Sequence, residues 1–64
     1  MNIKQKRVDN KITQEQLAEV LDIDRSTVAK WENGSAMPRA KMLSKLAATL
    51  NCTVDDLLAE NKED

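Results

Sequence analysis

Apolar residues recur at helical spacing along the chain, and no segment alternates between apolar and polar residues for long enough to predict a strand. Leu17, Val20 and Leu21 stand at positions i, i+3 and i+4, which predicts an apolar stripe along one face of a helix. The same spacing recurs between Leu43 and Leu50. The pattern therefore predicts an all-α fold in which each helix buries one face.

The first two predicted helices are separated by a clear start signal. Thr13 and Gln16 have the spacing of a capping box, so the second helix is expected to follow Thr13 and to end near Leu21. The first helix, about 2–9, is predicted more weakly because few of its residues are apolar.

Three further helices are predicted after residue 22. Asp24 is the expected N-cap of a third helix over about 25–33, and Gly34 is its expected left-handed end. Pro38 is expected in the first turn of a fourth helix, where its missing N–H costs nothing. A fifth helix is expected to begin at 52–53.

The second and third predicted helices are joined by the short segment Leu21-Asp22-Ile23-Asp24. Two amphipathic helices joined this tightly must cross steeply, and the small side chain of Ala18 allows a close crossing. The sequence therefore predicts a helix-turn-helix. At 100° per residue, Thr27, Val28 and Trp31 mark the buried side of the third helix.

The opposite side of the third helix is short and polar. It presents Ser26, Ala29, Lys30 and Asn33, with Arg25 on the flank of the first turn. Such a face fits the major groove of DNA, where Arg and Lys reach guanine acceptors and Ala contacts a thymine methyl group. Any surface helix has a polar outward face, so the short turn before this helix and the basic loop after it are what favour DNA.

Charge is distributed unevenly along the chain. The net charge of −1 argues against a nucleic-acid partner. Residues 1–45, however, hold nine Lys/Arg against six Asp/Glu, a balance of +3, whereas residues 46–64 hold one Lys against five Asp/Glu, a balance of −4. The first part of the chain can therefore present a positive face although the whole chain does not.

Composition excludes several classes of protein. The single cysteine, Cys52, allows no internal disulfide and no metal cluster, and the absence of His removes the commonest general base. No apolar run is long enough for a membrane span, and no leader precedes the first helix. We therefore expect a cytoplasmic protein that is not an enzyme, has no catalytic residues and binds no metal or cofactor.

Several stretches in the correct order and spacing resemble the phage repressor and Cro (Xre-like) type of helix-turn-helix DNA-binding domain. They are Gln14–Ala18, Leu21–Val28, Trp31–Gly34, Pro38, Leu46–Leu50 and Val54–Leu58. The resemblance implies a compact five-helix, lambda-repressor-like domain in which helices two and three form the helix-turn-helix. Asp22 departs from the family, which usually has Gly in this turn, and Asp tolerates the left-handed backbone better than most residues.

Length and resemblance together give expectations for the domain bounds, the DNA partner and the regulatory role. We expect residues 1–64 to form a single domain with its core at about 3–58 and a frayed acidic tail at 59–64. The resemblance implies that the third helix enters the major groove of a palindromic operator in double-stranded DNA bound by a homodimer. It also implies that the protein is a transcriptional repressor that is associated with the prokaryotic nucleoid when bound to DNA. With only 64 residues we expect no separate ligand-sensing or dimerisation domain.

The family's DNA-contacting positions transfer to this sequence one by one. The resemblance implies contacts to bases or phosphates from Gln14, Arg25, Ser26, Thr27, Ala29, Lys30, Asn33, Ser35, Arg39 and Lys41. It also implies a structural ion pair between Arg7 of the first helix and Glu32 of the third. Self-association is expected to use the fourth and fifth helices, around Leu50, Cys52, Val54 and Leu58.

Two other functions stay open. A protein-interaction module of the same fold, such as an antitoxin-like or adaptor domain, is favoured by the acidic tail and the net charge. A hydrolase is disfavoured because the scattered carboxylates and serines have no base to activate them.

Overall fold

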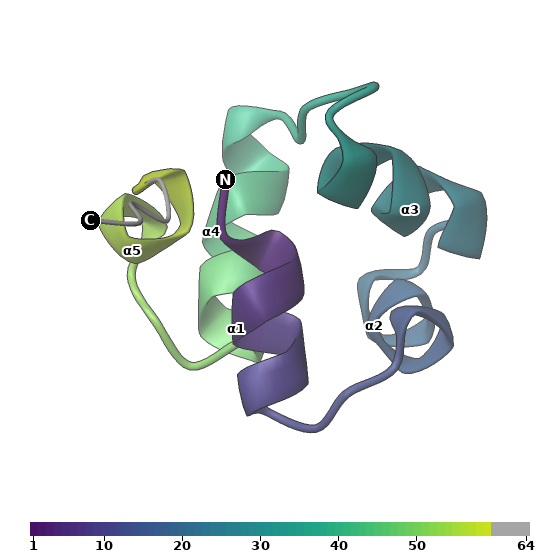
Figure 1. Cartoon of the computed structure of the whole chain (residues 1–64), viewed down its shortest axis with the longest axis horizontal. Coiled ribbons are helices and arrows are strands. Elements are labelled where there is room, and N and C mark those ends of the chain that lie inside the picture. The colour runs from purple at the N-terminus through teal and green to yellow at the C-terminus, as the bar shows by residue number, and fades with distance from the viewer. Residues whose placement is uncertain (60–64) are drawn as a thin grey trace.

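The computed structural model describes residues 1–59, which form five α-helices and no strand. The helices are α1 (Ile3–Asp9), α2 (Gln14–Leu21), α3 (Arg25–Asn33), α4 (Ala40–Thr49) and α5 (Val54–Leu58). In Figure 1, α1 and α4 lie in the middle, with α2 and α3 on one side and α5 on the other. The expected all-α, five-helix architecture is confirmed.

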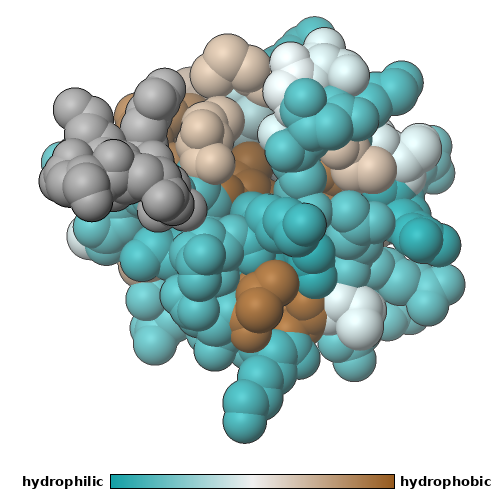
Figure 2. All heavy atoms as spheres, in the orientation of Figure 1, coloured by the Kyte–Doolittle hydropathy of each residue, from teal (hydrophilic) through white to brown (hydrophobic). Residues whose placement is uncertain are grey.

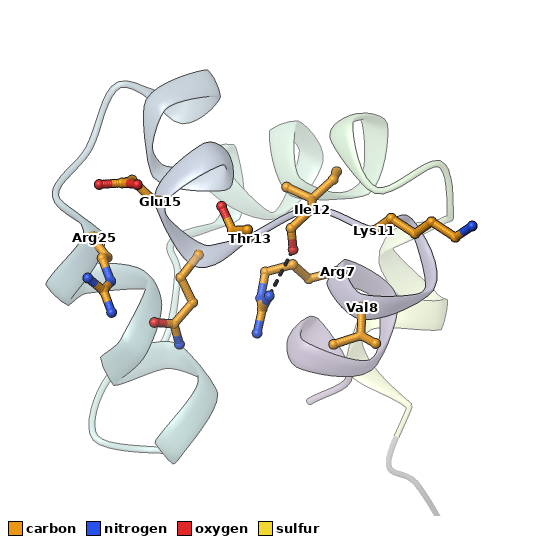
Figure 3. A pocket seen from close by; sticks show the side chains of 8 residues that line it. Arg7, Val8, Lys11, Ile12, Thr13, Glu15 and Arg25 are labelled. Carbon is orange, nitrogen blue, oxygen red and sulfur yellow. Dashed lines mark hydrogen bonds between the residues drawn. The ribbon is translucent and has the colours of Figure 1, made fainter.

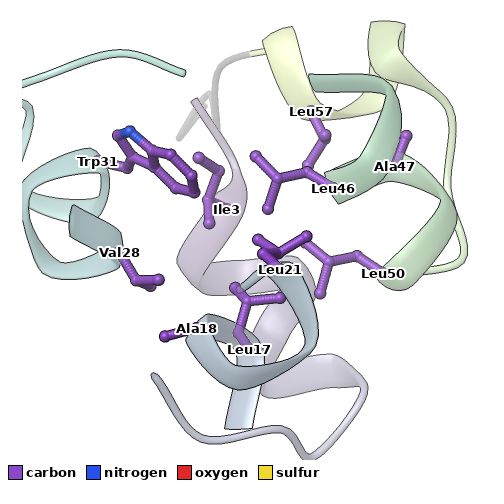
Figure 4. Close-up of a cluster of buried hydrophobic side chains, with 10 residues drawn as sticks. All are labelled: Ile3, Leu17, Ala18, Leu21, Val28, Trp31, Leu46, Ala47, Leu50 and Leu57. Atoms are coloured by element: carbon purple, nitrogen blue, oxygen red, sulfur yellow. The ribbon is translucent and has the colours of Figure 1, made fainter. Parts of the chain in front are cut away.

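All five helices contribute to one core. Ile3 of α1, Leu17 of α2, Val28 of α3, Leu46 of α4 and Leu57 of α5 are each at most 1% exposed. Figure 4 shows these side chains converging, with Trp31 at the edge of the cluster. Because every helix places a residue at the centre, the packing of the core fixes how α3 is presented.

The ends of α2 and α5 follow the capping rules. The Thr13 hydroxyl accepts from Gln16 N–H at 3.0 Å, and Gln16 Oε1 accepts from Thr13 N–H at 2.9 Å. Thr53 and Asp56 form a second capping box at the start of α5. The predicted box at Thr13 is therefore confirmed.

The start of α3 differs from the prediction. Asp24 is the N-cap residue, but its side chain accepts no hydrogen bond there. Its exposed carboxylate is left in water, so α3 lacks a side-chain cap. Gly34 ends the helix with φ +85°, as predicted.

Two further predictions of local structure are wrong. Pro38 lies outside α4, because Arg39 is an extended N-cap residue (φ −75°, ψ 166°) and the helix begins only at Ala40. The fixed φ of Pro38 suits this extended approach, and its ring is buried in the loop. Val20 is 65% exposed, because the core contacts of α2 come from Leu17, Ala18 and Leu21 alone.

Three non-glycine residues have left-handed backbones, each directly after or close to the end of a helix. Lys11 follows α1, Asp22 follows α2 and Asn51 follows α4, with φ of 58–59°. The left-handed turn expected at Asp22 is confirmed, with ψ of 47°. Each of these turns places a side chain in a conformation that favours glycine.

The first residues of the chain are attached to its last helix. Asn2 N–H donates to Leu57 O at 2.9 Å, and Asn2 Nδ2 donates to Asp56 O at 3.1 Å. Of the tail expected at 59–64, Ala59 alone is described, and its N–H donates to Asp55 O at 3.0 Å. The other five residues lie outside the described part of the chain.

The molecular surface is mainly polar. Figure 2 shows a largely hydrophilic face with separate hydrophobic areas. Within residues 1–59, none of the helices has both the length and the apolar character needed to cross a bilayer. The same residues include no group of three metal-ligating side chains of the His, Cys, Asp and Glu types.

Candidate nucleic-acid interface

The turn between α2 and α3 brings the two helices into a helix-turn-helix. Asp22 takes the left-handed conformation, and Ile23 N–H donates back to Ala18 O at 3.0 Å, five residues earlier. This bond closes the end of α2 in the manner of a Schellman motif. Ala18 is only 3% exposed, so its methyl group packs where a larger side chain would separate the helices. The reversal leaves one side of α3 against the core and the other in solvent.

The outward side of α3 is accessible and basic. Arg25, Ser26 and Lys30 are exposed, and Ala29 between them is half-buried. Neither Arg25 nor Lys30 has a carboxylate within 4.0 Å among residues 1–59, where the one ion pair is that of Arg7 with Glu32. No salt bridge therefore holds either cation, although Glu15 lines the same depression as Arg25.

Arg7, Glu32 and Gln14 form one network behind this face. Arg7 Nε donates to Glu32 Oε2 at 2.6 Å and Arg7 Nη2 donates to Glu32 Oε1 at 3.2 Å, a bidentate pair. Gln14 Nε2 donates to the same Oε1 at 2.9 Å, and Arg7 Nη1 donates to Ile12 O at 2.8 Å. The network joins α1, the α1–α2 turn and the first residue of α2 to the last turn of α3.

The environment of Glu32 keeps its carboxyl group ionised. Burial alone raises the pKa of Glu32, since its side chain is 6% exposed. Hydrogen bonds from Arg7 and Gln14, together with the charges of Arg7 and Lys4, outweigh burial and hold that pKa below its ordinary value. The role of Glu32 is therefore structural, because its carboxylate is fully occupied in holding α3.

A depression of about 570 Å³ lies at the N-terminus of α2 (Figure 3). Its wall includes Lys11, Gln14 and Arg25, with Glu15 also present. Figure 3 shows Arg25 on α3 across from the end of α1, and the hydrogen bond of Arg7 to Ile12 beneath. Lys11 was not among the residues expected from the sequence. Its position two residues before Thr13, where the capping box of α2 begins, is the signal that could have indicated it.

The remaining expected contact residues lie between the last residue of α3 and the first turn of α4. Asn33, Ser35, Arg39 and Lys41 are all exposed. Asn33 Oδ1 accepts from Ser35 N–H at 2.8 Å, which stabilises the loop after Gly34 and leaves the amide N–H₂ of Asn33 as a donor. Arg39 and Lys41 line a groove with Ile23, Thr27 and Trp31, which the pattern of α3 alone would not place beside them.

Thr27 differs from the other expected contact residues. It is half-buried and lies in the wall of an apolar groove beside Trp31, whereas Glu15 and Arg25 line the depression at α2. Among residues 1–59 no hydrogen bond joins Thr27 to Glu15. Its backbone N–H donates to Asp24 O at 3.0 Å.

The residues expected for self-association do not form one exposed surface, because their side chains are buried to different degrees. Leu50 is 1% exposed and belongs to the core, so that expectation is wrong for Leu50, because the last turn of α4 faces α5 and the centre of the molecule. Cys52 is half-buried, and burial raises the pKa of its thiol, so it packs as a neutral group. Leu58, in contrast, is 45% exposed.

Leu58 belongs to a different apolar surface, here called the uncharged patch. It is lined by Met1, Trp31, Gly34, Ala36, Met37 and Leu58. Met1, Met37 and Leu58 are three of the large apolar side chains that the structure leaves at least 37% exposed. These residues come from the start of the chain, the α3–α4 loop and the end of α5, so the sequence pattern of no single helix predicts the patch.

Comparison with known proteins agrees with this geometry. The helix-turn-helix family profile matches residues 3–57. The chain is 37% identical over 57 residues, 89% of its length, to the HTH-type transcriptional activator BcrR of Enterococcus faecalis, and it spans 28% of that protein. It is 40% identical over 48 residues, 75% of its length, to multiprotein-bridging factor 1a of Arabidopsis thaliana, and it spans 34% of that protein.

The chain thus spans about a third or less of the length of the curated relatives it matches. No solved structure gives a significant match. The family groups transcription regulators, which are not enzymes. The profile covers α1 to α4, α5 as far as Leu57 and the turn at Asp22, and the chain therefore belongs to the helix-turn-helix family of the phage repressor and Cro (Xre-like) type.

Proposed function

We propose that the chain is a sequence-specific double-stranded DNA-binding domain of a transcriptional regulator, with α3 in the major groove. The observation that supports this most directly is the exposed side of α3, where Arg25, Ser26 and Lys30 face solvent without acidic partners among residues 1–59. Arg and Lys there match guanine acceptors, the Ser hydroxyl can donate or accept, and Ala29 can meet a thymine methyl group.

A second group of residues is proposed to contact the DNA backbone and set the register. It consists of Lys11, Gln14, Thr27, Asn33, Ser35, Arg39 and Lys41. Phosphate contacts of this kind fix the orientation of the protein without specifying sequence. Gln14 has one amide hydrogen bond to Glu32, so its position is set before any DNA arrives. Glu15 lies in the same depression as Lys11, and its charge limits how closely a phosphate can approach there.

The domain is proposed to bind a palindromic operator as a homodimer that meets through the uncharged patch. The described side chains that line this patch are uncharged, although Met1 carries the α-ammonium group, and an apolar patch can complement itself across a two-fold axis. The Cα extents of 34 × 24 × 23 Å allow two domains to lie side by side at the half-site separation of about 34 Å.

More narrowly, we propose that the protein represses transcription in the cytoplasm. It would do so by occupying an operator that overlaps a promoter. The similar Enterococcus faecalis protein is named an activator. A reporter assay with the operator placed either over or upstream of a promoter separates these two outcomes. Reduced expression at the overlapping site supports repression, and increased expression at the upstream site alone contradicts it.

The DNA-binding proposal is tested on operators selected from random duplexes. Replacing Ser26 and Lys30 together with Ala is expected to weaken binding about a hundredfold, since each good base contact is worth about 1–3 kcal/mol. The melting temperature should stay nearly unchanged because both side chains are exposed. The matched control is Ser44→Ala with Lys45→Ala, two exposed residues of α4, which should leave affinity within about threefold.

Salt titration provides the second measurement. Affinity for the selected operator should fall steeply as salt rises, because contacts to several phosphates release counterions. A two-fold symmetric selected sequence, and loss of two-half-site binding in Leu58→Glu, would support the dimer. A flat salt response on every duplex, with no sequence enriched, would contradict DNA binding and favour the protein-interaction module that the net charge of −1 suggests.

A further inference from the structure

A second apolar depression, here called the α3–α4 groove, lies between α3 and the start of α4. It has a volume of about 400 Å³. Its apolar lining includes Ile23, Trp31, Met37 and Met42, and its charged side chains are Arg39 and Lys41. The lining comes from the α2–α3 turn, α3, the loop and α4, so the groove exists only because these segments pack together.

Most of this lining also serves the core: Trp31 belongs to the core, and Ile23 and Met42 pack against it. Trp31 is 8% exposed and Ile23 and Met42 are half-buried, yet Met37 is 68% exposed at the edge of the groove. Apolar side chains that gather at one surface depression mark an interaction site more often than scattered ones do. The packing of residues 1–59 therefore leaves Met37 uncovered beside the half-buried Ile23 and Met42.

Charge distinguishes which partner fits this surface. Arg39 and Lys41 are both exposed, and neither has a carboxylate within 4.0 Å among the residues that the structure describes. A second copy meeting this groove in a two-fold arrangement would bring like charges together, which disfavours self-pairing. An apolar side chain flanked by carboxylates satisfies both the lining and the two cations.

We propose that the α3–α4 groove docks an acidic amphipathic segment of a partner protein. One or two apolar side chains of the segment lie over Trp31 and Met42, and its carboxylates pair with Arg39 and Lys41. This is the helix-in-groove mode of recognition with a charge requirement added. Docking does not depend on DNA binding. The groove shares Trp31, Ala36 and Met37 with the uncharged patch, so a docked segment also competes with the proposed homodimer.

A consequence for regulation rests on the proposed function. Arg39 and Lys41 belong to the proposed phosphate contacts, so a docked acidic segment and the DNA backbone compete for the same two cations. The partner segment therefore excludes DNA from the domain.

Trp31 allows docking to be measured directly, because it is the only aromatic residue in the sequence and it lines the groove. The probe is a 16-residue synthetic peptide with Leu at helical spacing, Glu at the other positions and no aromatic residue. It should shift the emission of Trp31 in a saturable manner. A peptide with Lys in place of each Glu should bind at least tenfold more weakly, and equal binding of the two peptides would overturn the proposal.

Variants locate the site on the surface. Met37→Glu, and separately Arg39→Glu with Lys41→Glu, should weaken binding of the acidic peptide at least tenfold, since all three side chains are exposed and their replacement leaves the core intact. Val20→Glu is the matched control, because Val20 is 65% exposed on α2 and lies outside the groove. Unchanged binding by Met37→Glu, or no emission change with the unmodified chain, would overturn docking at this groove.

Competition is measured separately with a selected operator and the unmodified chain. The acidic peptide should lower the apparent affinity for DNA in proportion to its occupancy. Simultaneous binding of both would overturn the exclusion, while an emission change caused by DNA but not by the peptide would assign the groove to the DNA backbone. If no duplex binds, the proposed function fails, and the peptide titration alone still decides whether the groove docks an acidic segment.

Discussion

At the scale of single residues, Glu32 shows how one carboxylate organises several segments. It accepts hydrogen bonds from Arg7 and Gln14, and Arg7 extends the network to Ile12 O. A carboxylate this buried is stable only because these donors replace water. The position of α3 therefore depends on side chains from the first 14 residues of the chain.

Acid should weaken the fold through this residue. Burial raises the pKa of Glu32, but its hydrogen bonds to Arg7 and Gln14 keep the folded value below the ordinary 4.5. The stabilisation is then fully present above pH 4.5 and is lost as pH falls through the lower folded pKa. Glu32→Gln should cost about 2 kcal/mol at neutral pH, as expected for hydrogen bonds to a charged group.

Urea unfolding of both proteins between pH 7 and pH 3 checks this expectation. The difference in free energy of unfolding should be largest at neutral pH and should shrink below pH 4.5. A difference that stays constant over the whole range would contradict the assigned role of the carboxylate.

Asp22 offers a test of backbone strain. Its φ of 59° and ψ of 47° lie in the left-handed region, where a side chain costs roughly 1 kcal/mol relative to glycine. Asp22→Gly should therefore raise the free energy of unfolding by up to about 1 kcal/mol, measured in urea. Asp24→Gly is the control, because Asp24 has an extended backbone and gains nothing from glycine. Destabilisation by Asp22→Gly would show that the turn depends on the Asp side chain.

At the scale of helices, two N-caps that look equivalent in sequence differ in structure. Thr13 makes both bonds of a capping box, whereas the side chain of Asp24 makes no cap bond. Thr13→Ala should cost about 1 kcal/mol. Asp24→Ala should cost clearly less, and thermal or urea unfolding compares the two. Equal losses would mean that Asp24 caps α3 in solution.

Local signals predicted most helix boundaries, and packing decided the exceptions. The capping box at Thr13 and the left-handed glycine at 34 depend on neighbouring residues alone, so they could be recognised in the sequence. The start of α4 depends on Pro38 packing in the loop, and the exposure of Val20 depends on which side of α2 meets its neighbours. Neither of these tertiary contacts can be predicted from neighbouring residues in the sequence.

At the scale of the whole molecule, part of the candidate interface could be predicted from the sequence and part could not. The outward side of α3 follows from helical periodicity, so Arg25, Ser26 and Lys30 could be placed from the sequence. The ion pair of Arg7 with Glu32 was implied by family resemblance. The uncharged patch and the α3–α4 groove could not be predicted, because each joins side chains from segments far apart in the chain.

The hydrogen bonds of Asn2 to Leu57 and Asp56 have a consequence for how the domain assembles. They connect residues 54 to 55 positions apart, so the start of α1 is completed only when α5 is in place. During synthesis we therefore expect the start of α1 to be completed only after α5 has left the ribosome. We therefore expect the amides of both end helices to gain protection from hydrogen exchange in the same step, with neither half of the chain folding by itself.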